Sequence, residues 1–570
     1  MFLMDKLQLL LCFHCHQPLG NFDWVFEESY QRSYQPLLQT ISQHPRLKFS
    51  LHYSGLLYDW LASHQPDYLA LLKKLVKRGQ IELLSGGYYE PDFSLIPFED
   101  KIGQLELLNN FIKQNFGRPP LGAILPGRAC EAQLPKIFKK LALEYTLIDE
   151  DYFPQSSFLA PARPSFFTTE WEGETLFVFP IKRQLSESLG HQAPEELIAS
   201  LKRINQAQPG SLIVLVTDAE KYNSPDYLTA LFSLFAANTA WLDLTTFSLL
   251  LEEPSPFGLV YLPLDPKSHN FLMGCPAANN LHKKMLEVSS QLKTAAAAKS
   301  LFGKHEREQE ISKARCHLYQ GQGGTAYGKG IHHNHLRQAA YEQLILAGLE
   351  LDKIKHGNRP FVELTVSDLD KDGQAEVVLA NNVLSLYLSP KTGACFELDY
   401  KPKAVNLLST LTLDPAPKSV CSFVDQLLPD DGRPYAFLPN RKTGEVGLRL
   451  EKTGQVNGQQ IKLQKSLTLL ANQSIVAIEY ELSGELDGLS LGIEFNFNLK
   501  FVEPLPVVKL VDEAEGFTVL LELNQVAALT TYPVETVAHD GAKIYQGVKL
   551  LFCWQLAGTH WPLKINLRIE

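Results

Sequence analysis

The chain has 570 residues, which is enough for about three domains. Of these residues 45 % are hydrophobic and 20 % charged, which is an ordinary globular composition. Its net charge of −10 provides no basic surface for phosphate backbones, which argues against nucleic acid as the main partner. No stretch approaches the roughly 20 apolar residues of a membrane helix, and the first residues lack the pattern of a signal peptide. Eight dispersed cysteines, with no export signal, predict reduced thiols and a cytoplasmic protein.

The first 260 or so residues alternate short apolar runs with amphipathic helical patterns. The runs expected to be strands are residues 9–13, 47–52, 81–84, 121–125, 145–148, 175–180 and 212–216. Strand, helix and strand repeated about seven times predict a parallel sheet covered by helices, either an open sheet or a barrel. Polar residues that directly follow these strands are then expected at one rim, where such barrels carry their active sites.

The rest of the chain has two further patterns. Residues from about 280 to 356 are helical in pattern, interrupted by GQGGTAYGKGIHHNH, whose glycines are incompatible with a regular helix. After Pro360, alternating apolar runs punctuated by Gly, Asn and Pro predict a β-sandwich. We therefore expect an α/β plus all-β chain, with a barrel domain at 1–265, a helical region at 266–358 and a β-sandwich at 359–570.

Three histidine and cysteine side chains share one face of the first strand. Cys12, His14 and His16 lie two residues apart in CFHCHQP. Two functional interpretations compete: a metal site, since His and Cys are good zinc ligands, or neutral imidazoles that hydrogen-bond sugar hydroxyls at a barrel mouth. The alternative is that these histidines are buried in the core with their hydrogen bonds made there. That alternative is favoured for a single His, and less so for a pair above a Gln-Pro turn.

A second polar segment, SGGYYEPDF, follows the run at residues 81–84. Its double glycine lets the backbone approach a ligand, and its two tyrosines offer flat faces to sugar rings. Glu90 precedes a proline, which predicts an extended conformation. Glu99 and Asp100 suit the first turn of a helix and are given no functional role.

Two more motifs follow strands on the same side of the predicted sheet. GAILPGRACEAQLPK contains Gly127, Arg128 and Glu131, and VTDAEKY contains Asp218, Glu220 and Lys221. The charged residues of the second motif end the apolar run LIVLV. A solvated turn would explain them, but three charges directly after a buried strand favour a functional site.

These segments together resemble a known family. HCHQPLGNFDWVFEESY, GGYYEPDFSLIPFEDK, GAILPGRACEAQLPK and VTDAEKYN are similar to the first four sequence regions of glycoside hydrolase family 57, most of all to its 4-α-glucanotransferase branch. The similarity continues through NNLHKKMLEVS, HLRQAAYEQLILAGLELDK and GIEFNFNL. The resemblance implies an incomplete (β/α)7 barrel, a helical region and a C-terminal β-sandwich. It also implies retaining cleavage of α-1,4-glucan without a cofactor.

Carried onto this sequence, the family's acid/base aspartate falls on Asp218, and its nucleophile is a glutamate directly before Arg128. That position is Gly127, which cannot form a glycosyl ester. Glu131 matches a family position of its own and does not replace the nucleophile. The resemblance assigns substrate binding to His14, His16, Gln17, Trp24, Glu90, Arg128, Glu220 and Lys221.

Further departures agree with a loss of function. Ile124 and Cys130 stand where the family has tryptophans, a fifth signature region is missing after GLVYLPLD, and YQGQGG replaces an expected aromatic pair. We therefore expect an α-glucan-acting protein with impaired or lost catalysis. The alternatives are a non-catalytic α-glucan-binding or regulatory protein, or a metal-dependent hydrolase using His14 and His16, with a cluster at His332, His333 and His335. The expected partner is α-1,4-glucan or a maltooligosaccharide, and a homo-oligomer stays open.

Overall fold

The computed structural model describes residues 6–128, 131–153, 165–222, 225–263, 267–298, 304–328, 334–410, 421–428, 432–503, 507–537 and 543–570. The chain divides into two compact units, which are described separately below. The first comprises residues 1–270 with 322–325, and the second residues 271–321 with 326–570. In the described ranges, no helix is both long and apolar enough to cross a membrane.

The first unit is a barrel of parallel strands. Within its described residues, the strands run in the order β3-β2-β1-β8-β7-β5-β4. These strands are β1 (Leu7–Cys15), β2 (Phe49–Tyr53), β3 (Ile81–Leu84), β4 (Gly122–Ala123), β5 (Tyr145–Asp149), β7 (Glu174–Ile181) and β8 (Leu212–Asp218). Ser85, just after β3, forms a parallel bridge to Ala123 of β4. Among the described residues a single bridge thus joins the two edge strands into a nearly closed barrel, which confirms the predicted incomplete (β/α)7 barrel.

Each barrel strand is buried on both faces, as continuous apolar runs require. In β1, Leu9, Leu11 and Phe13 pack against the covering helices, whereas Leu10 and Cys12 belong to a separate interior cluster. His14 continues the interior face toward the carboxyl end of the strand. Strand periodicity thus directs the first histidine into the barrel mouth.

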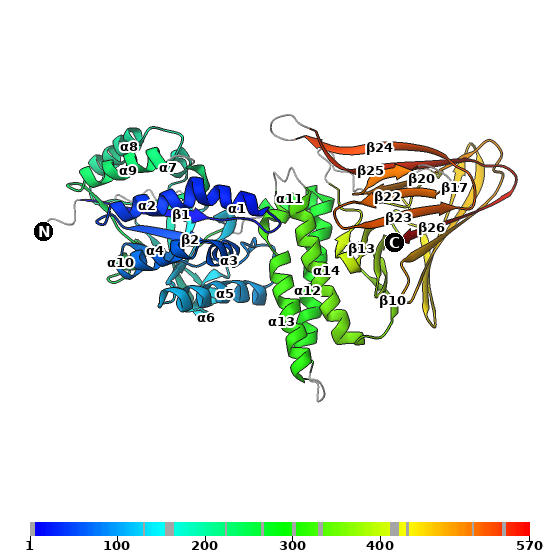
Figure 1. Cartoon of the computed structure of the whole chain (residues 1–570), viewed down its shortest axis with the longest axis horizontal. Coiled ribbons are helices and arrows are strands. Elements are labelled where there is room, and N and C mark those ends of the chain that lie inside the picture. The colour runs from blue at the N-terminus through cyan, green and yellow to red at the C-terminus, as the bar shows by residue number, and fades with distance from the viewer. Residues whose placement is uncertain are drawn as a thin grey trace. The chain divides into compact units, whose positions relative to one another are not determined.

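Helices surround this sheet (Figure 1). They are α1 (Asp23–Ser29), α2 (Gln35–Gln43), α3 (Gly55–His64), α4 (Pro66–Lys77), α5 (Phe98–Phe116), α6 (Leu134–Lys140), α7 (Arg183–Ser188), α8 (Pro194–Ala207), α9 (Pro225–Ala237) and α10 (Phe247–Leu250). As expected, Glu99 and Asp100 lie in the first turn of α5. Two strands were not predicted: β6 (Phe167–Trp171) pairs antiparallel with β7, and β9 (Leu242–Leu244) pairs with β1.

The second unit combines helices with antiparallel sheets. Helices α12 (Pro276–Ala297), α13 (Lys304–Gly321) and α14 (His335–His356) pack side by side (Figure 1). Helix α11 (Lys267–Gly274) precedes them. As predicted, the glycine-rich segment interrupts the helical pattern, because α13 ends at Gly321.

The antiparallel sheets follow α14. One has the order β10-β11-β12-β13-β14, a second β15-β20-β25-β24, and a third β16-β17-β18-β19-β26-β23-β22-β21. Their bounds are β10 (Val362–Ser367), β11 (Glu376–Asn381), β12 (Leu384–Ser389), β13 (Ala394–Tyr400), β14 (Val405–Asn406), β15 (Val424–Gln426), β16 (Ala436–Lys442), β17 (Glu445–Val456), β18 (Gln459–Leu470), β19 (Ile475–Ser483), β20 (Ser490–Phe497), β21 (Lys500–Glu503), β22 (Val507–Asp512), β23 (Phe517–Leu523), β24 (Ala528–Val537), β25 (Lys543–Gln555) and β26 (His560–Ile569). One hydrophobic core, with Leu386, Phe495 and Leu567 among its members, joins the three sheets. The predicted all-β part is thereby confirmed.

Candidate functional site

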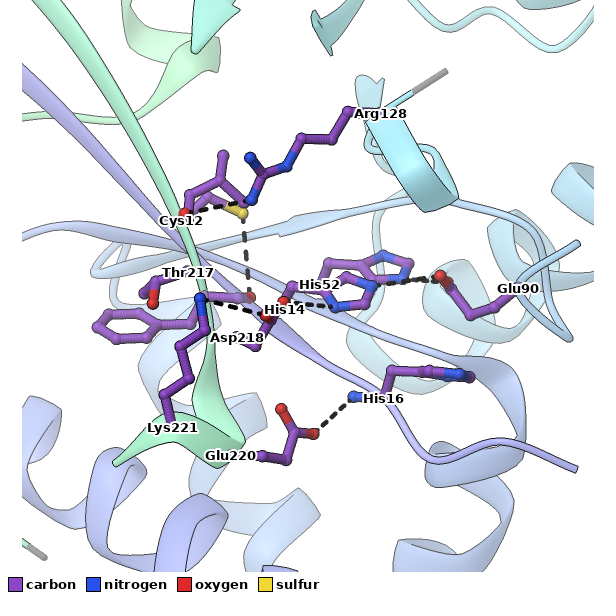
Figure 2. A network of polar contacts seen from close by, with 12 residues as sticks. Cys12, His14, His16, His52, Glu90, Arg128, Thr217, Asp218, Glu220 and Lys221 are labelled. Atoms are coloured by element: carbon purple, nitrogen blue, oxygen red, sulfur yellow. Dashed lines mark hydrogen bonds and ion pairs between the residues drawn. The ribbon is translucent and has the colours of Figure 1, made fainter. Parts of the chain in front are cut away.

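Strand register brings three polar side chains together at the carboxyl end of the barrel. His14 of β1 lies opposite His52 of β2 on one side and Asp218 of β8 on the other. The rings of His14 and His52 are stacked, with centroids 5.1 Å apart. His52 was not among the predicted site residues, although it ends the predicted strand at residues 47–52 and therefore had to lie at this rim. Figure 2 shows these residues within one polar network.

Glu90 joins the two histidines. Its Oε1 lies 2.7 Å from Nε2 of His52 and its Oε2 lies 3.2 Å from Nε2 of His14. The side chain is only 4 % exposed, so this carboxylate is nearly removed from water. Burial alone would raise the pKa of Glu90, but the neighbouring imidazoles hold it well below its usual range. Glu90 is thus an anion that fixes the orientation of both rings.

The backbone of Glu90 differs from the expectation. An extended conformation was predicted before Pro91, but the φ angle of Glu90 is 53°, in the left-handed region. Its amide donates to the oxygen of Gly87 at 3.1 Å, and its own oxygen accepts from the amide of Gly324 at 2.9 Å. These contacts outweigh the local preference of a residue before proline, so the prediction was wrong.

Residues 322–325, which come from the interrupted helical pattern, support this loop. Gly323 forms an antiparallel bridge with Pro91. The amide of Gln322 donates to Asp100 at 2.6 Å and accepts from Gln104 at 3.1 Å. A Cβ on Gly324 would lie 2.8 Å from the oxygen of Glu90. The glycines of YQGQGG therefore allow close backbone contact with the loop that carries Glu90.

Asp218 lies among positive charges. Its Oδ1 is 3.5 Å from Nδ1 of His14, and its Oδ2 is 3.5 Å from Nζ of Lys221. The hydrogen bond from His14 is the largest influence, and with the charges of Lys221 and Arg128 it outweighs burial and lowers the pKa of Asp218 to about 2. Burial would lower the pKa of His14, but its hydrogen bonds to Asp218 and Glu90 raise that pKa to about 10. At neutral pH the pair is an imidazolium beside a carboxylate.

His16 and Glu220 pack beside this network. The backbone amide of His16 donates to Oε1 of Glu220 at 2.9 Å, and the hydroxyl of Tyr34 donates to the same oxygen. Burial raises the pKa of Glu220 and lowers that of His16 to about 4, so His16 is a neutral imidazole. Nδ1 of His16 is buried and has no hydrogen-bond partner in the described part of the chain. Gln17 donates to the hydroxyls of Ser29 and Tyr34, both at 3.0 Å, and so holds the turn after β1.

Gly127 and Arg128 form a tight turn after β4. Gly127 has φ 63° and ψ 1°, and Arg128 has φ 51°. Arg128 reaches across the rim, with Nη1 donating to Oδ1 of Asp149 at 3.0 Å and Nη2 to the oxygen of Val216 at 3.5 Å. Among the described residues other than its two chain neighbours, no heavy atom would lie within 4 Å of a Cβ built on Gly127. Within this part of the chain, the space beside Gly127 is therefore open.

The remaining predicted residues lie apart from this network. Trp24 is 65 % exposed and stacks on Phe22, at a centroid distance of 6.3 Å. Glu131 forms an ion pair with Lys101. His335 belongs to α14 of the second unit, whereas His332 and His333 lie outside the described residues.

A group of side chains that could hold a metal ion lies here, but its members differ from the expected pair of His14 and His16. Among the described residues, ligand atoms of His14, His52 and Glu90 all lie within 4.8 Å of one another, and these residue types suit zinc. His16 is not part of the group, and its ring centroid is 6.0 Å from that of His14. Glu90 already hydrogen-bonds both histidines, so a metal would have to replace those two contacts.

Comparison with known proteins covers nearly the whole chain. The sequence model described as glycosyl hydrolase family 57 matches residues 10–263. The middle and C-terminal domains of alpha-amylase/4-alpha-glucanotransferase match residues 268–350, and 368–414 with 431–567.

Individual relatives agree. An alpha-amylase 1 from Dictyoglomus thermophilum is 30 % identical over 98 % of both chains, and a 4-alpha-glucanotransferase from Thermococcus kodakarensis is 27 % identical over 100 % of both. The crystal structure of 4-alpha-glucanotransferase from Thermococcus litoralis superposes with a TM-score of 0.84 at 24 % identity, over 99 % of this chain and 100 % of that one, and so shows the same fold. The chain therefore belongs to glycosyl hydrolase family 57.

Proposed function

We propose that this chain binds α-1,4-glucan or maltooligosaccharide at the carboxyl rim of its barrel, and that the family's covalent cleavage is impaired or lost. The observation that carries the proposal is Gly127. A retaining mechanism needs a nucleophilic carboxylate about 5–5.5 Å from the acid/base, and glycine at the nucleophile position supplies none. By the family resemblance, Asp218, the last residue of β8, takes the acid/base position.

The other carboxylates at this rim support the proposal because each already has a protein partner. Glu90 is held by His14 and His52, Asp149 by Arg128, and Glu220 by the His16 amide and the Tyr34 hydroxyl. Recruiting Glu90 or Asp149 as nucleophile would leave a buried or half-buried charge without its counter-ion, at a cost of several kcal/mol.

Substrate binding is supported by the donors and acceptors that the rim retains. The charged pair of His14 and Asp218, together with Lys221, offers both donors and acceptors to sugar hydroxyls. The exposed ring of Trp24 offers a stacking face. The binding partner that we propose is therefore an uncharged sugar polymer.

The seven described cysteines are free, which supports the cytoplasmic location predicted from the sequence.

The test combines binding with turnover. Maltoheptaose is titrated into the protein by calorimetry and then incubated with it in phosphate-free buffer, followed by chromatography of the products. We expect maltoheptaose to bind with measurable heat, and His14→Ala to weaken its affinity about tenfold or more. After incubation, we expect neither shorter nor longer glucans above background. Disproportionation that Asp218→Asn abolishes would instead show that family catalysis persists through another nucleophile, and absence of binding would refute a glucan site.

A metal-dependent hydrolase is the second candidate, favoured by the group of His14, His52 and Glu90. Elemental analysis of the purified protein tests it. One zinc per chain, lost in His52→Ala and accompanied by zinc-dependent glucan hydrolysis, would place this candidate first. Protein free of zinc would remove it.

A further inference from the structure

An acidic loop joins two strands of the second unit. The chain from the end of β10 to the start of β11 reads SDLDKDGQAE, residues 367–376, and its carboxylates belong to Asp368, Asp370, Asp372 and Glu376. Ser367 of β10 pairs with Glu376 of β11, so the end of one strand lies beside the start of the next. The hairpin thereby brings the first and the last carboxylate of the loop together.

Three of these carboxylates converge. A carboxylate oxygen from each of Asp368, Asp370 and Glu376 lies within 4.8 Å of the others. Glu376 is only 4 % exposed, and its Oε2 accepts from the amide of Leu369 at 2.7 Å. Like charges held this close repel one another, and burial strengthens the repulsion. A cation among them would turn this repulsion into attraction.

One oxygen of the group is buried without a hydrogen bond. Oδ1 of Asp368 is removed from solvent and has no hydrogen-bond partner in the described part of the chain, whereas its Oδ2 accepts from the amide of Gly373 at 3.2 Å. Buried polar atoms are nearly always satisfied, so an exception calls for an ion or a water molecule. Water would satisfy this oxygen but leave the negative charges unbalanced, whereas a cation would do both. The oxygen therefore points to a bound cation.

The nearby lysines do not occupy this position. Nζ of Lys371 donates to the backbone oxygen of Asp368 at 2.6 Å, and Nζ of Lys391 pairs with Oδ2 of Asp372 at 2.9 Å. Among the described residues, no lysine or arginine forms an ion pair with the three converging carboxylates. These carboxylates are therefore available to an ion from solution.

The spacing of the loop matches a calcium-binding pattern. Loops of the EF-hand type take side-chain ligands from positions 1, 3 and 5, a backbone oxygen from position 7 and often a further ligand from position 9, with glycine at position 6. These positions are held here by Asp368, Asp370, Asp372, Gly373, Gln374 and Glu376. The glycine has a φ angle of 88°, which suits the sharp turn. Position 12, a bidentate glutamate in EF-hands, is Leu379 in the hydrophobic core, so Glu376 would bind the ion directly.

We propose that Asp368, Asp370 and Glu376 form a calcium site that fastens the hairpin of β10 and β11, with Asp372 exchanging its contact with Lys391 for the ion. All the ligands are oxygens, and carboxylates on an irregular loop suit calcium better than magnesium, which requires octahedral geometry and keeps most of its waters. The loop contains no histidine or cysteine, the residues that favour zinc. The site belongs to the second unit and does not depend on glucan binding.

The experiment uses the full chain after treatment with EDTA and dialysis into metal-free buffer. Calcium chloride and magnesium chloride are titrated separately by calorimetry, and thermal unfolding is followed with and without calcium. We expect one calcium per chain, bound about tenfold or more tighter than magnesium, and a rise in Tm of about 2 °C or more at saturation. No calcium binding up to about 5 mM would overturn the proposal, and equal affinity for magnesium would overturn the choice of ion.

Two variants locate the site. Asp370→Asn removes a charge but keeps an oxygen that can accept from the amide of Asp372, a bond of 3.0 Å in the wild type, so the chain should fold while calcium affinity falls about tenfold or more. Glu376→Gln should weaken calcium binding at least as much. Without calcium, its Tm should equal or exceed that of the wild type, because a repelling charge is gone.

Asp512→Asn is the matched control. Asp512 also accepts two backbone amides in a hairpin turn, those of Ala514 and Glu515, but it belongs to none of the metal-ligating groups among the described residues. Its calcium affinity should equal that of the wild type. Calcium binding that survives unchanged in both Asp370→Asn and Glu376→Gln would show that the ion binds elsewhere and would overturn the proposal.

Discussion

Restoring the carboxylate is the sharpest perturbation that the chain offers. In Gly127→Glu, the new Cβ meets no atom of the described residues within 4 Å, so we expect no overpacking cost. The backbone does impose a cost, because φ is +63° there and a left-handed conformation costs an L-residue roughly 1–2 kcal/mol. For a unit of this size we expect Tm to fall by about 2–8 °C.

The expected gain is in turnover. Removing the nucleophile of a catalytic set costs up to about 10⁶ in kcat in a serine protease, so restoring one should increase glucan disproportionation by about 10³ or more. We expect a gain below the full factor because, by the family resemblance, Ile124 and Cys130 stand where tryptophans are expected. Products are followed from maltoheptaose in phosphate-free buffer.

Gly127→Gln is the matched control. It has the same size and the same backbone strain as Gly127→Glu but no carboxylate, so its Tm should fall equally while its turnover stays at the wild-type level. The reasoning is refuted if Gly127→Glu folds, binds maltoheptaose and turns over no faster than Gly127→Gln. That result would mean that the nucleophile is not the main deficiency of this site.

Three further changes test other parts of the structure. The pKa of His14 is raised to about 10, so its contribution to stability is complete below about pH 6.5 and is lost as pH rises through 10. Between pH 7 and pH 10.5, the free energy of unfolding measured in urea should therefore fall more in wild type than in His14→Gln. Gly324→Ala places a Cβ 2.8 Å from the backbone oxygen of Glu90, so it should lower the free energy of unfolding by about 1–3 kcal/mol and weaken glucan binding. Its control is Gly348→Ala in α14, where no described atom lies within 4 Å of the new Cβ and the change should be neutral or stabilising. Lys284→Met leaves buried carboxylates, among them Glu397, without their cation and should cost about 3–5 kcal/mol in chemical unfolding, part of which Glu397→Gln should restore.

The barrel could be predicted because its strands are buried on both faces and read as uninterrupted apolar runs between amphipathic helices. Strand β4 is the exception, since only Gly122–Ala123 of the run at residues 121–125 pair in the sheet. Strand β6 escaped prediction because its sequence, FTTEW, mixes apolar and polar residues without a clear period. Short irregular strands of this kind depend on their neighbours more than on their own pattern.

The candidate site was predictable only in part, for reasons of register. The pattern placed His14 and Asp218 at the same rim, because both follow apolar strand runs. Their pairing, and that of His14 with His52, depends on how β1 aligns with β8 and β2, which local sequence does not determine. The left-handed backbone of Glu90 likewise depends on Gly324, more than 200 positions away along the chain.

The loss of one carboxylate changes the chemistry of the one that remains. In a site with two close carboxyl groups, each raises the pKa of the other, which keeps one of them protonated and able to act as an acid near neutral pH. In this chain Gly127 offers no such partner, and the hydrogen bond from His14, with the charges of Lys221 and Arg128, outweighs burial and lowers the pKa of Asp218 to about 2. A carboxylate at position 127 would raise that pKa, so Gly127→Glu should change the protonation of Asp218 as well as add a candidate nucleophile.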